Sequence, residues 1–292
     1  MKIMITGAGG MLGRGLSAIF AAVPGWQVQS YNREALDVAE RAAVQAALAS
    51  CAPQVVIHLA ACTDVDRGEK EPDAVYRTNF LGTWYLCQAC AEQELTLVFL
   101  SSDLVFDGNK GLPYVETDRP NPLNVYGCSK LAGEQLVRGM VRRHYIIRAG
   151  WMFGTADRDH KFAGKIMERA LSGKSLHVVM DRIGSPVYTY DLAEKIRDIL
   201  AERLPWGTYH VVNKGLCSRY DFACHILSYA GMEKVPLYPV SSAMFPQGAR
   251  RPINSALRNY ALELMGCNTM RPWQEALQEY VVKKLCPGVD HA

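Results

Sequence analysis

The chain has little net charge and no long apolar segment. Its 292 residues include 32 Lys and Arg against 29 Asp and Glu, which gives a formal net charge of +3. So small a charge does not favour nucleic acid as a partner. No apolar run reaches the roughly 20 residues of a membrane-spanning helix, so we expect no membrane partner. The opening stretch, MKIMITGAGG, reads as the start of folded structure rather than as a signal peptide.

The sequence also lacks a metal-binding or disulfide pattern, although it holds nine cysteines. They are scattered among apolar residues, at Cys51, Cys62, Cys87, Cys90, Cys128, Cys217, Cys224, Cys267 and Cys286. Cys87 and Cys90 form a C-x-x-C, but no second pair accompanies them. We interpret them as buried thiols of an amphipathic helix, and we predict no metal site. Unpatterned thiols suit a reducing environment, so we expect a cytoplasmic protein.

Short apolar strands and helical stretches alternate along the first half of the chain. Helical patterns separate four strand patterns, at residues 2–6, 27–31, 54–59 and 96–100. This alternation predicts an α/β fold, a Rossmann-type doubly wound parallel sheet with right-handed crossovers. The second half mixes short strands, at 175–179 and 208–212, with helical stretches at 161–172, 191–201 and 220–230.

A glycine-rich turn follows the first expected strand. Gly7, Gly10 and Gly13 have the spacing G-x-x-G-x-x-G, and a helical pattern follows from Leu12. Such glycines let the backbone approach a pyrophosphate closely, and the N-terminus of the helix attracts its negative charge. The turn therefore predicts dinucleotide binding, with a simple tight turn as the alternative.

The residues after the second strand bear on the choice between NADPH and NADH. A 2′-phosphate favours a basic partner there, and a 2′-hydroxyl favours an acidic one. The chain offers Arg33 followed by Glu34. We expect NADPH from Arg33, and Glu34 leaves NADH open. Asp37 reads from the sequence as a residue that starts the helix expected at 40–50.

Tyr126 and Lys130 form a Y-x-x-x-K pair on an expected helix. Residues four apart lie on one helix face, so the ammonium is expected to lower the phenol pKa from its usual value of about 10. Such a Tyr can exchange a proton with an alcohol or ketone. Ser102 follows a strand whose carboxyl end faces the ligand, where its hydroxyl would bond the same carbonyl oxygen. A chance Y-x-x-x-K and a turn-capping Ser102 are the alternatives.

A basic segment at residues 248–252 contains adjacent Arg250 and Arg251. Two neighbouring guanidinium groups can neutralise a diphosphate by bidentate contacts. The segment therefore indicates a site for a diphosphate, with a solvated basic loop as the alternative.

Several stretches together resemble one known family. They read GAGGMLG, HLAACTDVD, SSDLVFDG and NVYGCSKLAGE, then RAGWMFG, DRIGSPVYTYDLA and RRPINSAL. These motifs resemble extended short-chain dehydrogenases/reductases and, more narrowly, the dTDP-4-dehydrorhamnose reductase family. The resemblance covers most of the chain. It implies an NAD(P)-binding Rossmann domain at 1–153 and a mainly substrate-binding region at 154–292, some segments of which return to the Rossmann domain.

The resemblance also implies roles for individual residues. The cofactor would contact Gly7, Gly10, Met11, Leu12, Gly13, Arg33, Asp37, Val38, Ala60, Ala61, Thr63, Tyr126 and Lys130. The sugar nucleotide would contact Thr63, Val65, Ser102, Asp103 and Trp151, together with Arg250 and Arg251. Ser102, Tyr126 and Lys130 would form the catalytic triad.

The activity implied by the resemblance is reduction of a 4-keto sugar nucleotide by NADPH, or by NADH. For this family it is dTDP-4-dehydro-L-rhamnose to dTDP-L-rhamnose, with hydride delivered to C4 and Tyr126 as proton donor. The product would feed a surface polysaccharide, and a homodimer is one assembly of the family. Leu104 stands where the family usually has Tyr, which leaves the exact sugar open. A related reductase or epimerase, and a non-catalytic NADP-binding regulatory subunit, remain alternatives.

Overall fold

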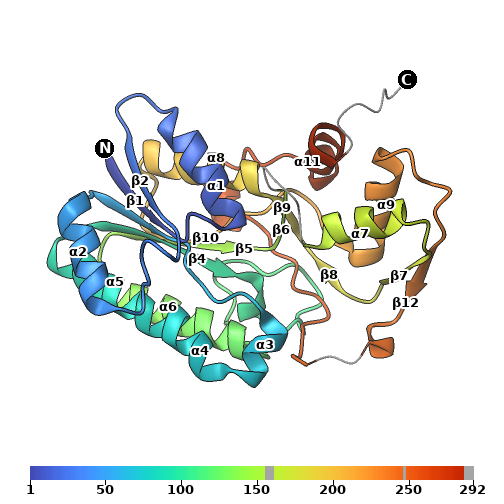
Figure 1. Ribbon diagram of the computed structural model, residues 1–292, viewed down its shortest axis with the longest axis horizontal. Coiled ribbons are helices and arrows are strands. Elements are labelled where there is room, and N and C mark those ends of the chain that lie inside the picture. The colour runs from blue at the N-terminus through green and yellow to red at the C-terminus, as the bar shows by residue number, and fades with distance from the viewer. Residues whose placement is uncertain (155–160, 246–247, 286–292) are drawn as a thin grey trace.

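The chain forms a larger lobe around a parallel sheet and a smaller lobe beside it (Figure 1). The computed structural model describes residues 1–154, 161–245 and 248–285. Cys286 and the end of the predicted substrate-binding region lie outside the described residues.

The sheet of the larger lobe has six strands in the order β10-β5-β4-β3-β1-β2, and every pair is parallel. The strands are β1 (Lys2–Thr6), β2 (Gln27–Tyr31), β3 (Val55–His58), β4 (Thr96–Ser102), β5 (His144–Ala149) and β10 (Gly207–His210). The chain passes from β1 to β2 on one side and then to β3 on the other, so the order reverses at β1. Ligands of such sheets bind at that reversal, outside the carboxyl ends of the strands. The predicted fold is confirmed.

Helices cover both faces of this sheet, which is why its central strands are apolar on both sides. On β1, Ile3 and Ile5 contribute to one buried cluster and Met4 to the other. The first face carries α1 (Met11–Ala21) and α8 (Thr189–Ala201), and the second carries α2 (Arg41–Cys51), α5 (Gly82–Glu92) and α6 (Val125–Met140). Cys87 and Cys90 lie in the second cluster as fully buried free thiols, as predicted.

The segment between β3 and α5 is not one continuous α-helix. It contains α3 (Val65–Lys70), which was not predicted, then α4 (Pro72–Tyr76) and a π-helical turn η1 (Arg77–Leu81) that continues into α5. The π-turn holds Asn79, which is fully buried. Turns of this kind widen a helix locally and are frequent at functional sites.

The smaller lobe has its own apolar core between short strands and three helices. The helices are α7 (Phe162–Leu171), α9 (Arg219–Tyr229) and α11 (Trp273–Tyr280). The strands pair as β6 (Trp151–Phe153) with β9 (Pro186–Tyr188), β7 (Leu176–Val179) with β12 (Leu237–Val240), and β8 (Ile183–Gly184) with β11 (Cys217–Ser218). The remaining short elements are η2 (Asp103–Val105), η3 (Ser242–Met244), α10 (Tyr260–Leu264) and η4 (Val281–Leu285).

The second half of the chain contributes to both lobes, because β10 and α8 belong to the larger one. Its expected helices and strands are present, with most ends shifted by a residue or two. A division of the chain at residue 153 stays a prediction.

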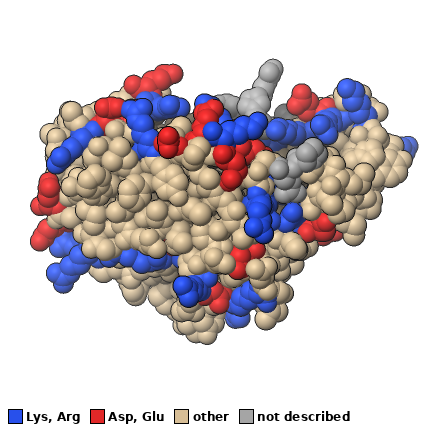
Figure 2. Space-filling model, turned by 90° about the horizontal axis from the view of Figure 1, so that it is seen from below, with Lys and Arg blue, Asp and Glu red and all other residues tan. Residues whose placement is uncertain are grey.

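Charged side chains of both signs are interspersed on the face shown in Figure 2. Within the described ranges, none of the helices is long and apolar enough to cross a membrane. In the same part of the chain, His, Cys, Asp and Glu side chains do not gather in a group of three or more that could hold a metal ion.

Candidate active site

A cavity of about 710 Å³ lies where the strand order reverses, and it extends to the smaller lobe. Its volume is typical of a small-molecule site, about 300–1,000 Å³. Most residues implied by the family resemblance line it: Gly7, Gly10, Met11, Leu12, Gly13, Arg33, Asp37, Val38, Ala60, Ala61, Thr63, Ser102, Asp103, Tyr126, Lys130 and Trp151. Val65, Arg250 and Arg251 are not among its lining residues.

The glycine turn after β1 forms one end of the cavity. Gly7 has φ of +69°, and a Cβ atom there would lie 2.5 Å from the backbone nitrogen of Ala60. The turn therefore packs directly against the segment after β3 only because residue 7 has no side chain. α1 begins at Met11 and has no acidic residue in its first turn, so its positive end is not neutralised locally. These features fit the pyrophosphate of a dinucleotide.

The segment after β2 forms the outer edge of the same end. Arg33 is exposed and lines the cavity, whereas Glu34 does not line it. Asp37 also lines the cavity, and its carboxylate accepts a hydrogen bond from the backbone nitrogen of Ala39 at 2.9 Å. A basic side chain therefore lines the end of the cavity next to the glycine turn.

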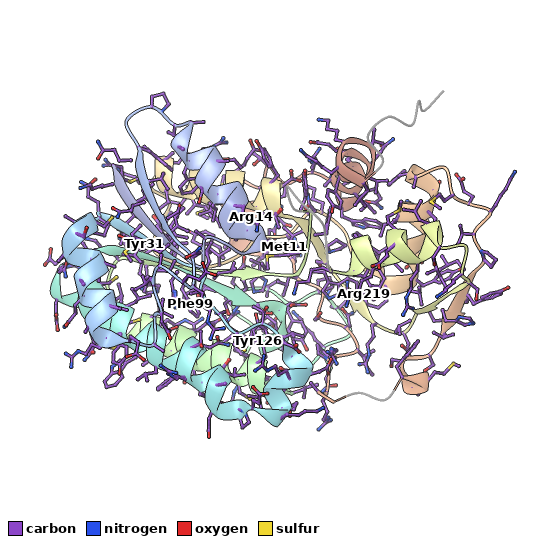
Figure 3. The ribbon with its side chains drawn as sticks, in the orientation of Figure 1. Met11, Arg14, Tyr31, Phe99, Tyr126 and Arg219 are labelled. Atoms are coloured by element: carbon purple, nitrogen blue, oxygen red, sulfur yellow. The ribbon has the colours of Figure 1, made fainter. Side chains whose placement is uncertain are left out.

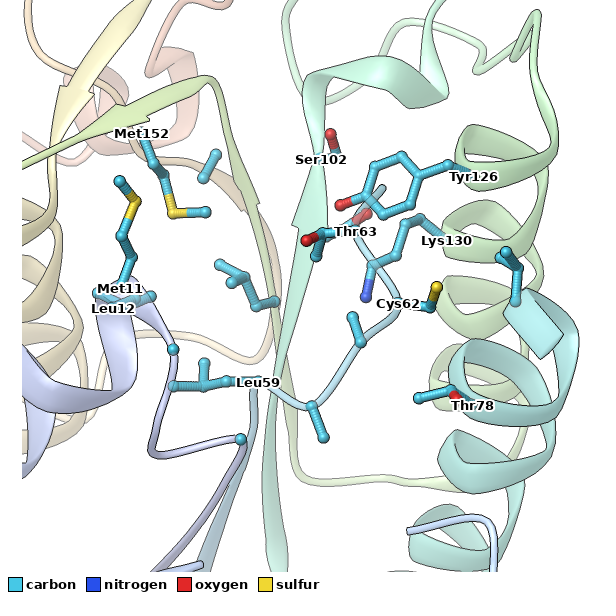
Figure 4. Close-up of a pocket in the computed structure, with 18 of the residues that line it drawn as sticks. Met11, Leu12, Leu59, Cys62, Thr63, Thr78, Ser102, Tyr126, Lys130 and Met152 are labelled. Carbon is cyan, nitrogen blue, oxygen red and sulfur yellow. The ribbon is translucent and has the colours of Figure 1, made fainter. Parts of the chain in front are cut away.

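Ser102, Tyr126 and Lys130 lie together at the middle of the cavity (Figure 4). Tyr126 and Lys130 project from the first turns of α6, whose N-cap Asn124 accepts a hydrogen bond from the backbone nitrogen of Gly127 at 2.8 Å. Ser102 ends β4, and its hydroxyl donates to Asp103 at 3.1 Å. In Figure 4 the Tyr126 hydroxyl points toward Thr63, and Ser102 lies beside the Tyr126 ring.

The acidity of Tyr126 differs from the expectation that Lys130 lowers it. Burial raises the pKa of Tyr126 to about 12, although the hydrogen bond with Ser102 opposes the shift. Burial also lowers the pKa of Lys130 to about 7, with Glu134 acting in the opposite direction. The Lys130 ammonium lies 4.1 Å from the centre of the Phe99 ring. The expectation that Lys130 lowers the pKa of Tyr126 is therefore wrong, because burial is the largest cause of the shift and the charge of Asp103 raises the pKa further. A phenol with a raised pKa stays protonated at neutral pH, as a proton donor must.

Titration of Lys130 tests how deeply it is buried. Its pKa is about 7 in the folded protein, against about 10.4 in an unfolded chain. Between these values the unfolded chain binds more protons, so the free energy of unfolding rises with pH. We expect wild type to gain about 2 kcal/mol relative to Lys130→Met between roughly pH 7 and pH 9, measured by denaturant titration. An identical pH dependence of both proteins would show that Lys130 keeps its ordinary pKa.

The loop after β3 is fixed from behind by Asn79 of the π-turn. The Asn79 amide accepts from the backbone nitrogen of Cys62 at 2.7 Å and donates to its carbonyl oxygen at 3.1 Å. It also donates to Ser129 on α6 at 2.9 Å. Asn79 thus ties the segment that contains Thr63 to the helix that carries Tyr126.

The two arginines of the basic segment lie at a second, smaller cavity of about 270 Å³, which Arg182 also lines. Arg251 forms a bidentate ion pair with Asp66, at 2.9 and 2.6 Å. Arg250 contributes its carbonyl oxygen to the Asn124 side chain at 2.8 Å. A role of Arg250 and Arg251 in binding a diphosphate stays a prediction. The Asp66 carboxylate already balances the charge of Arg251.

Arg219 is a site residue that the sequence reading missed. It lines the large cavity, and its guanidinium lies 3.6 Å from the centre of the Trp151 ring. The helical pattern after residue 219 could have placed it at the start of a helix. Only the fold brings that helix next to β6.

Known proteins of similar sequence and structure identify the family. Residues 1–286 match the family described as RmlD substrate binding domain. A dTDP-4-dehydrorhamnose reductase of Clostridium acetobutylicum is 36% identical, with a TM-score of 0.92 and coverage of 96% of this chain and 98% of that one. This chain belongs to the dTDP-4-dehydrorhamnose reductase family.

Two further relatives match over nearly the full length. The dTDP-4-dehydrorhamnose reductase of Bacillus anthracis, solved in complex with NADP, is 35% identical with a TM-score of 0.91, covering 97% of this chain and 100% of that one. The spore coat polysaccharide biosynthesis protein SpsK of Bacillus subtilis is 35% identical over 283 residues, covering 97% of this chain and 98% of that protein. The predicted family is confirmed, and with it the predicted class, an NAD(P)H-dependent oxidoreductase of the dTDP-4-dehydrorhamnose reductase type.

Proposed function

We propose that this chain is an NADPH-dependent reductase that converts dTDP-4-dehydro-L-rhamnose to dTDP-L-rhamnose for surface polysaccharide synthesis. The observation that carries the proposal is a single cavity lined by the glycine turn after β1 and by Ser102, Tyr126 and Lys130. The names of the family members support the sugar nucleotide as substrate, and the NADP complex of the Bacillus anthracis relative supports the cofactor. The described cysteines are free, which supports a cytoplasmic location.

In the proposed mechanism the glycine turn after β1 would hold the cofactor, which when bound would supply hydride to C4 of the sugar. Tyr126 holds its proton at neutral pH, because its pKa is raised to about 12, and donates it to the carbonyl oxygen. The Ser102 hydroxyl turns from Asp103 toward that oxygen and stabilises the developing negative charge. Asp103 keeps its hydrogen bond from Ser255 at 2.6 Å. Lys130 lies beside Tyr126 and would hold the ribose next to the nicotinamide when the cofactor is bound.

Arg33 provides the preference for NADPH over NADH in this proposal, because it is the basic side chain at the outer edge of the cavity. We expect Arg33→Ala to raise the KM for NADPH about 10- to 100-fold, the effect of losing hydrogen bonds between charged groups. The KM for NADH should change less than about twofold, since a 2′-hydroxyl does not use that charge. Arg41→Ala, which removes an exposed charge from α2, is the control. Equal changes for both cofactors would contradict the assignment.

The proposed reaction is tested by NADPH oxidation with enzymatically generated dTDP-4-dehydro-L-rhamnose, with the product identified by comparison with authentic dTDP-L-rhamnose. We expect one NADPH consumed for each product molecule. An epimerase would change the sugar without net loss of NADPH. Tight binding of NADPH without oxidation by any keto sugar would instead favour a regulatory subunit.

A second candidate substrate is another 4-keto sugar nucleotide. Leu104 lines the cavity beside Asp103 where the resembling family usually has Tyr, so one hydroxyl near the substrate is replaced by an alkyl group. Losing a hydrogen-bonding group changes selectivity against sugars that need it. Oxidation of NADPH with a different 4-keto sugar, but not with dTDP-4-dehydro-L-rhamnose, would select this candidate.

A further inference from the structure

We propose that Arg219 binds the diphosphate of the sugar nucleotide and thereby sets the affinity of the enzyme for its substrate. This inference rests on the proposed function and assigns a specificity residue to the same site. It places the diphosphate at the start of α9 and not at Arg250 and Arg251.

The start of α9 holds the Arg219 backbone in place. Ser218 caps the helix by accepting a hydrogen bond from the backbone nitrogen of Asp221 at 2.9 Å, and Asp221 accepts from the backbone nitrogen of Ser218 at 2.9 Å. This reciprocal pair satisfies two helix donors. The Asp221 carboxylate is therefore occupied by hydrogen bonds from Ser218 and does not pair with Arg219. The Arg219 guanidinium lines the cavity instead.

Aromatic rings hold the Arg219 side chain. Its guanidinium lies 3.6 Å from the centre of the Trp151 ring and 4.9 Å from that of the Phe162 ring. The Trp151 ring packs against Gly184, which has no side chain. A Cβ atom at Gly184 would overlap the indole. Stacking of this kind fixes the guanidinium plane and leaves its N–H donors free at the edges. Such a group is prepared for bidentate contact with a phosphate.

Arg219 forms no ion pair among the described residues, unlike Arg251 and Arg67. Arg251 pairs with Asp66 at 2.6 Å, and Arg67 pairs with Glu71 at 2.7 Å. Burial lowers the pKa of Arg219 to about 10, so the group stays charged at neutral pH. Asp103 is the carboxylate whose charge acts on Arg219, but the two do not form an ion pair among the described residues. A half-buried cation that faces a cavity in this way favours an anionic ligand.

The position of Arg219 matches the shape of a sugar nucleotide. Figure 3 places Arg219 on the smaller lobe and Tyr126 on the larger lobe. In a hexose ring, C1 lies across from C4. A sugar with C4 at Tyr126 therefore directs the diphosphate on C1 away from α6. Trp151, Phe162 and Arg219 all line the cavity, and Figure 3 shows Arg219 apart from Tyr126 and α6.

The test compares Arg219→Gln, which removes the charge, with Arg219→Lys, which keeps it but loses the planar fork. The control is Arg169→Gln, which removes an exposed charge from α7 of the same lobe. We measure kcat and KM with dTDP-4-dehydro-L-rhamnose, and the Kd of dTDP and of NADPH by calorimetry. We expect Arg219→Gln to raise the substrate KM and the dTDP Kd about 10- to 100-fold. The kcat and the NADPH Kd should stay within about twofold, and Arg219→Lys should recover part of the loss.

The outcomes separate this inference from the proposed function. An unchanged NADPH Kd in Arg219→Gln shows that the variant is folded. If the wild type reduces the sugar nucleotide but the variant keeps the wild-type KM and dTDP Kd, the inference fails and the proposed function stands. If the wild type reduces no such sugar but its dTDP binding depends on Arg219, the inference stands and the proposed function fails. A loss of kcat with unchanged dTDP binding would also overturn the inference.

Discussion

Tyr126→Phe is expected to lower kcat with the keto sugar nucleotide about 10²- to 10⁴-fold, the usual contribution of a general acid. The substitution removes the only group of the Tyr126 side chain that can donate a proton to the carbonyl oxygen. The NADPH Kd should change little, because the glycine turn and Arg33 form a separate part of the cavity. Steady-state kinetics and calorimetry on the same preparation measure both quantities.

The control for Tyr126→Phe is Tyr238→Phe, which removes a phenol from an exposed tyrosine of β12. This control should keep wild-type kcat. A Tyr126→Phe enzyme that keeps more than about a tenth of wild-type kcat would exclude Tyr126 as the proton donor. In that case Ser102 would be the next hydroxyl to test, since its hydrogen bond acts on the Tyr126 phenol.

The outline of the site could be predicted from sequence because the fold is a parallel sheet. All strands of such a sheet point the same way, so residues that follow β1, β3 and β4 meet at one edge. Gly7, Ala60 and Ser102 are far apart in the sequence but line one cavity for this reason. The helical spacing of Tyr126 and Lys130 placed the pair on one face of α6.

The acidity of the pair could not be predicted from its spacing. Spacing fixes which groups are neighbours, whereas the pKa depends on how completely the surrounding chain removes water from them. Phe99 on β4 lies against the Lys130 ammonium, and burial is the largest cause of the shifts of both residues. Neither fact follows from the sequence of α6.

Whether a basic residue forms an ion pair depends on residues that are distant from it in the sequence. Arg251 and Asp66 are 185 positions apart, and nothing local to either residue indicates that they pair. Arg219 lies beside Trp151 only because β6 and α9 pack in the same lobe. Local patterns therefore singled out Arg250 and Arg251 as candidate cations, but the fold decides which arginines form ion pairs and which line the large cavity.

Glu134→Ala is expected to lower the free energy of unfolding by about 3–5 kcal/mol, the effect of leaving a buried charge unpaired. Glu134 is fully buried on α6 and accepts hydrogen bonds from Arg148 at 2.8 Å through both of its oxygens. It also accepts from Ser101 at 2.6 Å. Without it, Arg148, itself only 1% exposed, loses its carboxylate partner. Urea titration measures the change.

Two further variants separate the buried pair from the surface contact of the same carboxylate. Arg138→Ala removes the half-exposed partner at 2.7 Å and should cost about 0–1 kcal/mol. Glu134→Leu combined with Arg148→Met replaces both buried charges and should recover most of the loss, because the penalty comes from the charge left alone. Equal destabilisation by the double and single variants would show that packing, not charge pairing, carries the effect. Glu134 lies one turn from Lys130 on α6 and accepts a hydrogen bond from Ser101, the neighbour of Ser102. The kcat of the double variant therefore also shows whether the catalytic residues need this ion pair to keep their positions.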